Sequence, residues 1–237
     1  SKSVADDFTL WLKESFPRRH SVPEVRWFRL GSDFENSAPS QGLPSGAKDT
    51  LKQIKRTSSF LMVGTLEPRK AHAQALAAFE LLWSQGEDIT LVIVGKQGWM
   101  VETLVDHIKN HPERGKRLIW LDGISDEYLD KVMKSVTCLL APSLGEGFGL
   151  PLIEAARYQM PILARDIPVF REVAGSSAQY FQGTHAEELA GAIKSWLRQS
   201  QNQSKNNAPS EFNSSTMEIT SWAESANQLM TLIKQPM

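Results

Sequence analysis

Residues 141–154 read APSLGEGFGLPLIE, and the rest of the chain is interpreted outward from this stretch. The apolar run 136–141 leading into it predicts a strand, and the pattern at 150–158 leading out predicts a helix. Between them, every second residue from 145 to 149 is glycine, so the backbone can turn sharply and a ligand can approach it closely. Pro151 suits the first turn of the helix, where its missing N–H costs nothing.

The first turn of such a helix is a favourable place for an anion, because its N–H groups and the helix dipole point toward it. Glu146 and Glu154 flank this turn, with seven residues between them. Two carboxylates suit a ligand that carries hydroxyl groups as well as phosphate, because carboxylates accept hydrogen bonds from hydroxyls. A nucleotide sugar, with a diphosphate between a ribose and a hexose, has this chemistry. The alternative is that the glycines only let the helix pack closely on its sheet, and the loop alone does not decide between the two.

Composition narrows the class of protein. The 237 residues can form one large domain or two small ones, and the net charge of −1 argues against a nucleic-acid partner. The single cysteine, Cys138, lies in an apolar strand pattern and is interpreted as a core residue, which fits a reducing compartment. We see no signal peptide and no apolar run near the roughly 20 residues of a membrane helix. A cytoplasmic location is expected, with any membrane association carried by parts outside this chain.

Strand patterns alternate with helix patterns along most of the chain, joined by short connections. This order predicts an α/β fold, with a Rossmann-like, parallel, six-stranded sheet and helices on both faces. Ligands of such sheets bind at the carboxyl ends of the strands, where the loops 64–70 and 142–149 both fall. The expected strands are 59–63, 89–94, 118–121, 136–141, 161–164 and 178–181, and the expected helices are 71–85, 99–111, one opening at 125, 150–158, 169–173 and 186–199.

The two ends of the chain are predicted to lie outside this core. A helix is expected at 4–15, a short strand at 25–30 and a loop at 31–50, with the core beginning at residue 58. The polar stretch 200–215 reads as a linker, and 217–234 as a final amphipathic helix. The predicted units are therefore residues 1–24, a domain at 25–200, a linker at 201–215 and a closing helix within 216–237.

Arg69 and Lys70 are adjacent cations at the start of a predicted helix, where the dipole disfavours positive charge. This conflict favours a bound phosphate over a solvated pair. His107 and His111 share a helix face and can in principle hold a metal, but an exposed pair is the preferred interpretation, and no metal site is predicted. Neither a P-loop nor the dinucleotide-binding fingerprint is present.

The chain resembles the C-terminal, donor-binding domain of a retaining GT-B glycosyltransferase of the group 1 family. The resemblance covers roughly residues 25–199 and makes the predicted sheet one half of a GT-B fold. Its motifs here are a phosphate loop at 64–70, base-side loops at 95–98 and 122–126, and the paired-Glu motif within 142–154. It continues through 164–168 and 172–175.

The resemblance implies roles for individual residues. Lys70 would bind the diphosphate, Glu154 the ribose hydroxyls, and Glu146 would face the donor sugar near its reacting carbon. The family often has Arg where this chain has Thr65, and Arg69 is expected to supply that charge. The expected catalytic residues are Glu146, Lys70 and Arg69, and the expected donor-binding residues are Gly64, Thr65, Arg69, Lys70, Gly95, Ile124, Glu146, Gly147, Phe148, Gly149, Leu150 and Glu154.

The resemblance also implies partners. The substrate would be a nucleotide-diphospho-sugar. The sequence Glu-Pro-Arg-Lys at 67–70 is similar to the corresponding sequence of mannosyltransferase-like members, which favours GDP-mannose as the donor. No cofactor or metal is expected, because Arg69 and Lys70 can neutralise the leaving diphosphate. Residues 1–17 and 217–234 would belong to, or cross back to, an N-terminal acceptor-binding domain of the same protein, which would hold a glycan or lipid-linked acceptor. The alternatives are a nucleotide-sugar epimerase of the same architecture and a catalytically incompetent nucleotide-binding or docking domain.

Overall fold

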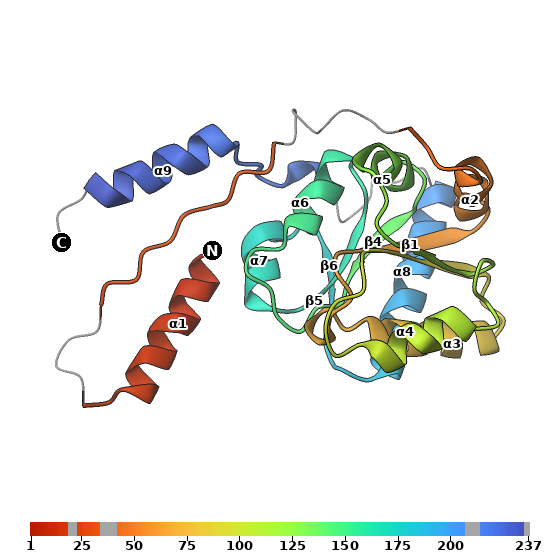
Figure 1. The fold of residues 1–237 in the computed structure, drawn as a ribbon, viewed down its shortest axis with the longest axis horizontal. Helices are drawn as coiled ribbons and strands as arrows, with labels where there is room; N and C mark the ends of the chain where they lie inside the picture. Colours follow the sequence, from red (N-terminus) through yellow and green to blue (C-terminus); the bar gives the residue numbers. More distant parts are fainter. Residues whose placement is uncertain (19–22, 34–41, 207–213, 235–237) are drawn as a thin grey trace.

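A computed structural model describes residues 1–18, 23–33, 42–206 and 214–234 of the chain. Helices and strands alternate from α2 to α8, and single helices lie near the two ends (Figure 1). The elements are α1 (Lys2–Ser15), α2 (Ala47–Ile54), β1 (Ser58–Val63), the 3₁₀ turn η1 (Pro68–Lys70), α3 (His72–Ser84), β2 (Ile89–Val94), α4 (Glu102–Asn110), β3 (Leu118–Leu121), α5 (Asp126–Met133), β4 (Cys138–Ala141), α6 (Leu150–Arg157), β5 (Ile162–Arg165), α7 (Pro168–Ala174), β6 (Gln179–Phe181), α8 (Ala186–Asn206), η2 (Ser214–Thr216) and α9 (Trp222–Lys234).

The six strands form one sheet in the order β3-β2-β1-β4-β5-β6, and every neighbouring pair is parallel. The predicted parallel six-stranded α/β fold is therefore confirmed. Strand β2 (ITLVIV) is buried along its whole length, as expected for a strand covered on both faces. The chain moves outward from β1 to β3, then returns to the other side of β1 with β4, so β1 and β4 lie at the point where the winding direction reverses.

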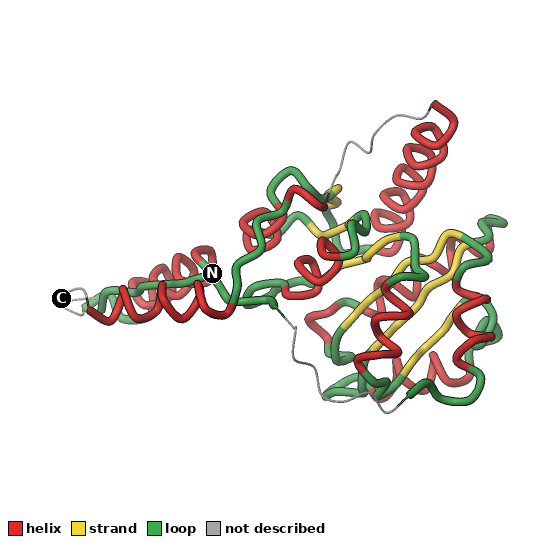
Figure 2. Tube along the Cα trace, turned by 90° about the horizontal axis from the view of Figure 1, so that it is seen from above, coloured by secondary structure: helices red, strands yellow, loops and turns green. Residues whose placement is uncertain are grey.

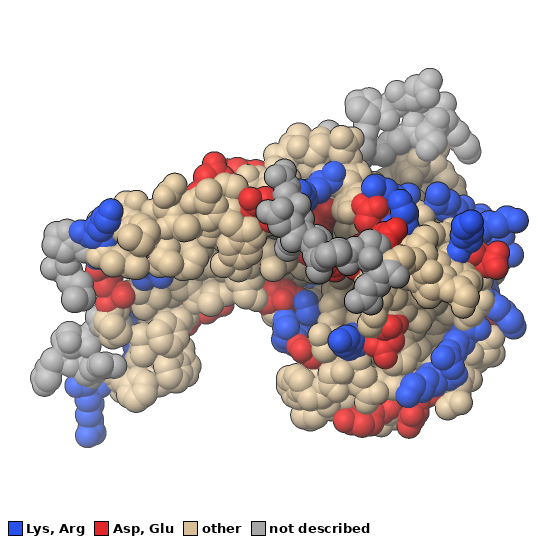
Figure 3. All heavy atoms as spheres, turned by 45° about the horizontal axis from the view of Figure 1, so that its top comes forward, with Lys and Arg blue, Asp and Glu red and all other residues tan. Residues whose placement is uncertain are grey.

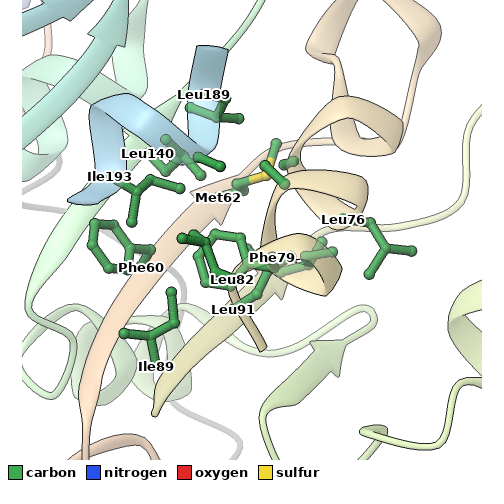
Figure 4. Packing of buried hydrophobic residues seen from close by; sticks show 14 of the residues in the cluster. Phe60, Met62, Leu76, Phe79, Leu82, Ile89, Leu91, Leu140, Leu189 and Ile193 are labelled. Atoms are coloured by element: carbon green, nitrogen blue, oxygen red, sulfur yellow. The ribbon is translucent and has the colours of Figure 1, made fainter. Parts of the chain in front are cut away.

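Helices cover both faces of the sheet, and each face has its own apolar core (Figure 2). Helices α3, α4 and α8 contribute to one core, and α2, α5, α6 and α7 contribute to the other. In the first core, Phe79 of α3 meets Phe60 of β1 edge to face, with ring centroids 5.7 Å apart. Figure 4 shows these rings among aliphatic side chains from β1, β2, α3 and α8.

The structure corrects several expectations about the ends of the chain. The segment 25–30 is not a strand among the described residues, and it runs as extended chain along α9 instead. The core begins before residue 58, because α2 begins within the stretch 31–50 that was expected as a loop, and it buries Ala47 and Ile54 in the second apolar core. Helix α8 continues to Asn206, into the stretch expected as a linker. Part of that stretch, residues 207–213, lies outside the described residues.

Helix α9 begins later than expected, at Trp222, because a capping box fixes its start. The Ser221 hydroxyl accepts the backbone N–H of Glu224 at 3.1 Å, and the Glu224 carboxylate accepts the backbone N–H of Ser221 at 2.8 Å. In the parts of the chain that the structure describes, no helix is both long and apolar enough to cross a membrane.

Helix α1, residues 23–33 and α9 form an arm that projects from the sheet domain (Figures 1 and 2). Within the arm, residues 23–33 bond to α9: the Arg29 N–H donates to Gln228, and the Ser225 hydroxyl donates to the Arg29 carbonyl at 2.7 Å. The first turn of α1 reaches the sheet domain, where two of its backbone N–H groups donate to the Glu172 carboxylate of α7, each at 2.7 Å. The arm thus contacts α7 at the carboxyl edge of the sheet.

The buried ring of Phe79 predicts a large stability effect. We expect Phe79→Ala to lower the free energy of unfolding by about 3–5 kcal/mol, because it removes a fully buried ring and leaves a cavity. Trp99→Ala, which truncates a 56% exposed ring, is the control and should change the free energy by less than about 0.5 kcal/mol. Urea unfolding curves measure both values, and equal losses would show that the ring of Phe79 is not a core contact.

Candidate functional site

The loops after β1 and β4 meet at the reversal point of the sheet, because these two strands are direct neighbours. The backbone N–H of Leu144, in the loop after β4, donates to the carbonyl of Arg69, in the loop after β1, at 2.7 Å. The structure therefore places the two glycine-bearing loops side by side, as the alternation of strands and helices predicted. In doubly wound sheets this edge is where ligands bind.

Backbone conformation explains how each loop turns. Gly149 has φ +92° and forms the N-cap of α6, and a Cβ there would also lie only 3.0 Å from the Phe170 ring. Gly95, after β2, approaches Gly64 so closely that a Cβ would lie 1.9 Å from the Gly64 carbonyl oxygen. Ala71, with φ +56°, separates η1 from α3, so Arg69 and Lys70 stand outside the helix rather than in its first turn.

The two cations converge on one carboxylate. Lys70 Nζ lies 2.5 Å from Glu146 Oε1, and Arg69 Nη1 lies 2.8 Å from Glu146 Oε2. Arg69 also pairs with Glu67 at 2.9 Å, and Ser143 bonds Glu146. Burial by itself raises the pKa of Glu146, but these bonds outweigh it and hold that pKa below its ordinary value. Glu146 is therefore an ionised carboxylate held between two cations, and each cation is oriented by it.

A groove of about 580 Å³ opens beside this cluster. Lys70 and Glu146 line it together with residues 147–150, and the first half of α1 and residues 25–28 form the opposite wall. Its volume lies within the range of small-molecule sites. A Cβ at Gly147 would meet nothing within 4 Å, so the loop leaves open space there.

His72 is a further residue of this candidate site, and the sequence analysis did not identify it. It is 2% exposed and lines a small cavity together with Lys70, Ser143 and Glu146, and its Nδ1 has no hydrogen-bond partner in the described part of the chain. Burial, together with the nearby charge of Lys70, lowers the pKa of this imidazole to about 4. The imidazole is therefore neutral at pH 7. Its place two residues after Lys70 was the only signal in the sequence.

The other expected donor-binding residues are distributed around this cluster. Gly64 places its backbone near Lys70, with a Cβ position 3.5 Å from Lys70 Nζ, and Gly95 packs on Gly64. Thr65 packs toward Gly98, and Ile124 is half-buried against the second core. Neither lines the groove.

Glu154 does not join the ion cluster. Burial raises its pKa above the ordinary value, with Arg157 and Lys70 opposing the rise, and no ion pair to it is present among the described residues. A half-buried carboxyl group with this environment is suited to accept hydrogen bonds from neutral donors such as hydroxyl groups. Its predicted role at the ribose stays a prediction.

A possible metal-ligand set lies elsewhere, on α3 and α4. His107 Nε2 and His111 Nε2 lie 2.9 Å and 3.0 Å from the same Glu80 oxygen. However, His111 Nδ1 accepts the backbone N–H of Glu113 at 3.1 Å, so the proton of the neutral ring is on Nε2 and points to Glu80. A metal-bound histidine normally donates from its other ring nitrogen, and this arrangement therefore favours a structural role.

Comparison with known proteins places the chain in a family. The family model described as "Glycosyl transferases group 1" matches residues 48–211, which include the ion cluster and all six strands. The chain therefore belongs to the glycosyl transferases group 1 family.

The curated relatives include the serotype-specific mannosyltransferase WbdA of Escherichia coli, which is 47% identical over 199 residues. That match covers 83% of this chain but only 24% of the relative, so the chain spans about a quarter of its length. It is also similar to the O-antigen chain mannosyltransferase B of Escherichia coli, with 31% identity over 62% of this chain and 38% of the relative.

Solved structures share the fold at lower identity. The C-terminal domain of a glycosyl transferase group 1 family protein (LpcC) from Francisella tularensis matches with a TM-score of 0.55 and 16% identity, over 84% of this chain and 96% of that one. The catalytic domain of starch synthase IV from Arabidopsis thaliana, bound to ADP and acarbose, matches with a TM-score of 0.61 and 16% identity, over 79% of this chain and 42% of that one. These matches confirm that the sheet domain has the fold of one half of a GT-B glycosyltransferase.

The buried imidazole of His72 predicts a pH dependence of stability. Its pKa is about 4 in the folded protein and 6.5 ordinarily, so the unfolded chain binds the proton more readily. The contribution of the neutral imidazole to the free energy of unfolding is fully present above pH 6.5. It is lost as the pH falls toward 4, by at most about 1.4 kcal/mol per pH unit. Urea unfolding between pH 7 and 5 should show a shallower loss for His72→Leu than for the wild type. Parallel curves would contradict the prediction.

Proposed function

We propose that this chain is the donor-binding part of a retaining glycosyltransferase that moves a hexose from a nucleotide-diphospho-sugar to a glycan or lipid-linked acceptor. The observation that carries the proposal is the convergence of Lys70 and Arg69 on Glu146, beside a groove at the carboxyl edge of the sheet. Mannose from GDP-mannose is the preferred donor, because the relatives that span most of this chain are named mannosyltransferases.

The chemistry follows from these residues. As the bond between the anomeric carbon and the diphosphate breaks, negative charge grows on the leaving diphosphate. Lys70 and Arg69 can stabilise that charge, and so can the start of α6, which has no side-chain cap. In the structure, Glu146 forms ion pairs with both Lys70 and Arg69. We infer that the diphosphate competes for them, which frees Glu146 to face the sugar hydroxyl groups.

The arm supplies the surface for the acceptor-binding domain of the same protein. Its exposed apolar side chains lie on α1, on residues 23–33 and on α9, and tan atoms dominate the arm in Figure 3, whereas blue and red atoms are mixed over the sheet domain. Phe8 and Trp11 stack with centroids 5.7 Å apart while remaining about half exposed. Such a surface is typical of a protein interface. Its large side chains are Val4, Phe8, Leu10, Trp11, Phe16, Trp27, Trp222, Leu229, Met230 and Ile233.

Calorimetric titration of the full-length protein with GDP, UDP and ADP, without added metal, tests the donor site. We expect saturable binding of one of the three, with GDP preferred. Lys70→Ala should weaken it by about tenfold or more, because a charge-assisted bond to the diphosphate is lost. Glu154→Ala should also weaken it, through the lost ribose bonds.

Lys109→Ala is the matched control, because this exposed lysine lies in the last turn of α4, away from the ion cluster. It should leave the affinity unchanged. Sugar transfer measured on the same variants should fall for Lys70→Ala and for Glu154→Ala, and should stay unchanged for Lys109→Ala. A Lys70→Ala protein with full affinity and full transfer would overturn the assignment of the site.

A further inference from the structure

Arg165, the last residue of β5, is a buried cation that the proposed reaction does not use. It is 5% exposed, and its guanidinium stacks on the Phe181 ring at 5.0 Å from the centroid. Among the described residues no carboxylate lies within ion-pair distance of it. Burial lowers the pKa of Arg165 from its ordinary value, with Glu188 opposing from farther away. Burying a charge among neutral partners lowers the stability of the fold, so stability alone does not explain an arginine at position 165.

Its three nitrogens bond to three separate segments of the chain. Nε donates to the Pro142 carbonyl at 2.8 Å, Nη1 donates to the Gly183 carbonyl, and Nη2 donates to the side-chain oxygen of Gln74. Gln74 in turn donates to the His185 carbonyl at 2.8 Å. A planar guanidinium carries its N–H donors on three nitrogens in a fixed geometry, which suits such a three-way link. An ammonium group has its three donors on a single nitrogen and lacks this geometry.

Two of these partners adjoin the candidate site. Pro142 opens the loop that carries Glu146, and Gln74, in the first turn of α3, lies four residues after Lys70. Arg165 therefore bonds to the start of the Glu146 loop and to the helix that follows the Arg69–Lys70 loop. The spacing between the cations and Glu146 depends on the spacing between these two segments.

We propose that Arg165 is a positioning residue of the donor site, which fixes the distance between the Glu146 loop and the Arg69–Lys70 loop through its bonds to Pro142 and Gln74. This inference rests on the proposed function, because it assumes that a diphosphate binds between these loops. Arg165 is buried and bonds to neutral groups, which distinguishes this link from the surface ion pairs of the described residues.

The test compares Arg165→Lys with Arg117→Lys in the full-length protein. Arg117 also stacks on a ring, that of Trp83 at 5.4 Å, and bonds to Glu113 and to the Glu87 carbonyl, but it precedes β3 at the opposite edge of the sheet. Both variants keep the charge and lose the fork. Thermal unfolding identifies a temperature at which both are fully folded, and calorimetry with GDP, UDP and ADP is then done at that temperature.

We expect Arg165→Lys to raise the Kd of the bound nucleoside diphosphate by about tenfold, as for loss of a bond to a charged group, and Arg117→Lys to leave it unchanged. Gln74 provides a second pair of variants in case Arg165→Lys does not fold. Gln74→Met breaks the link to α3 and should also raise the Kd. Gln74→Glu keeps the acceptor for Arg165, now as an ion pair, and loses the bond to the His185 carbonyl. Because that lost bond does not join the two loops, the Kd should stay near that of the wild type.

The outcomes separate the two proposals. Binding by the wild type, with equal Kd values for all folded variants, would overturn the role of Arg165 and leave the proposed function standing. Lack of binding by the wild-type full-length protein to any of the three nucleotides would overturn both. A raised Kd for Arg165→Lys and Gln74→Met, but not for Gln74→Glu or Arg117→Lys, would support the positioning role.

Discussion

The pairing of β1 with β4 is the contact on which the site depends. The two strands are far apart in sequence, yet Phe60 lies opposite Cys138 and Leu61 opposite Leu139 in the sheet. The chain continues from β1 to α3 on one face of the sheet and from β4 to α6 on the other face, so the two connections diverge and leave a crevice between them. The loop with the two cations and the loop with Glu146 can therefore meet there, and the short backbone bond from Leu144 to Arg69 holds them together.

Within that frame, opposite charges determine the local geometry. The carboxylate of Glu146 forms ion pairs with both Lys70 and Arg69, and the groove lies beside these ion pairs. The neutral His72 lies next to this cluster rather than adding a third cation, because burial removes its charge. Under the proposed function, a diphosphate would compete with Glu146 for these cations, and its affinity would depend on the spacing of the two loops.

The sheet, and the edge at which the two loops of the candidate site meet, were predictable from sequence, and several contacts between these loops were not. Continuous apolar runs such as residues 89–94 identify buried strands, and the strict alternation with helices then fixes the edge at which Lys70 and Glu146 fall. No local pattern shows that Glu146 pairs with both cations, or that Arg165 links Pro142 to Gln74, because these partners are brought together only by the folded sheet. The segment 25–30 has the residue types of a strand, but its backbone bonds to α9 and not to another strand among the described residues.

Besides the contact of α1 with Glu172, the described part of the arm meets the sheet domain near Ser32 and Thr220, which bond to each other. The backbone N–H of Ser32 donates to the carbonyl of Thr220 at 3.0 Å, and Arg157 of α6 donates to the carbonyl of Ser32 at 3.0 Å. This place can act as a pivot, with α9 as the lever, only when the bonds from α1 to Glu172 are released, because those bonds hold the arm at a second place. Helix α9 is about 20 Å long at 1.5 Å per residue, so a rotation of about 6° at the pivot moves its far end by about 2 Å. Small rotations at Ser32 and Thr220 would then appear as larger displacements at the far end of α9.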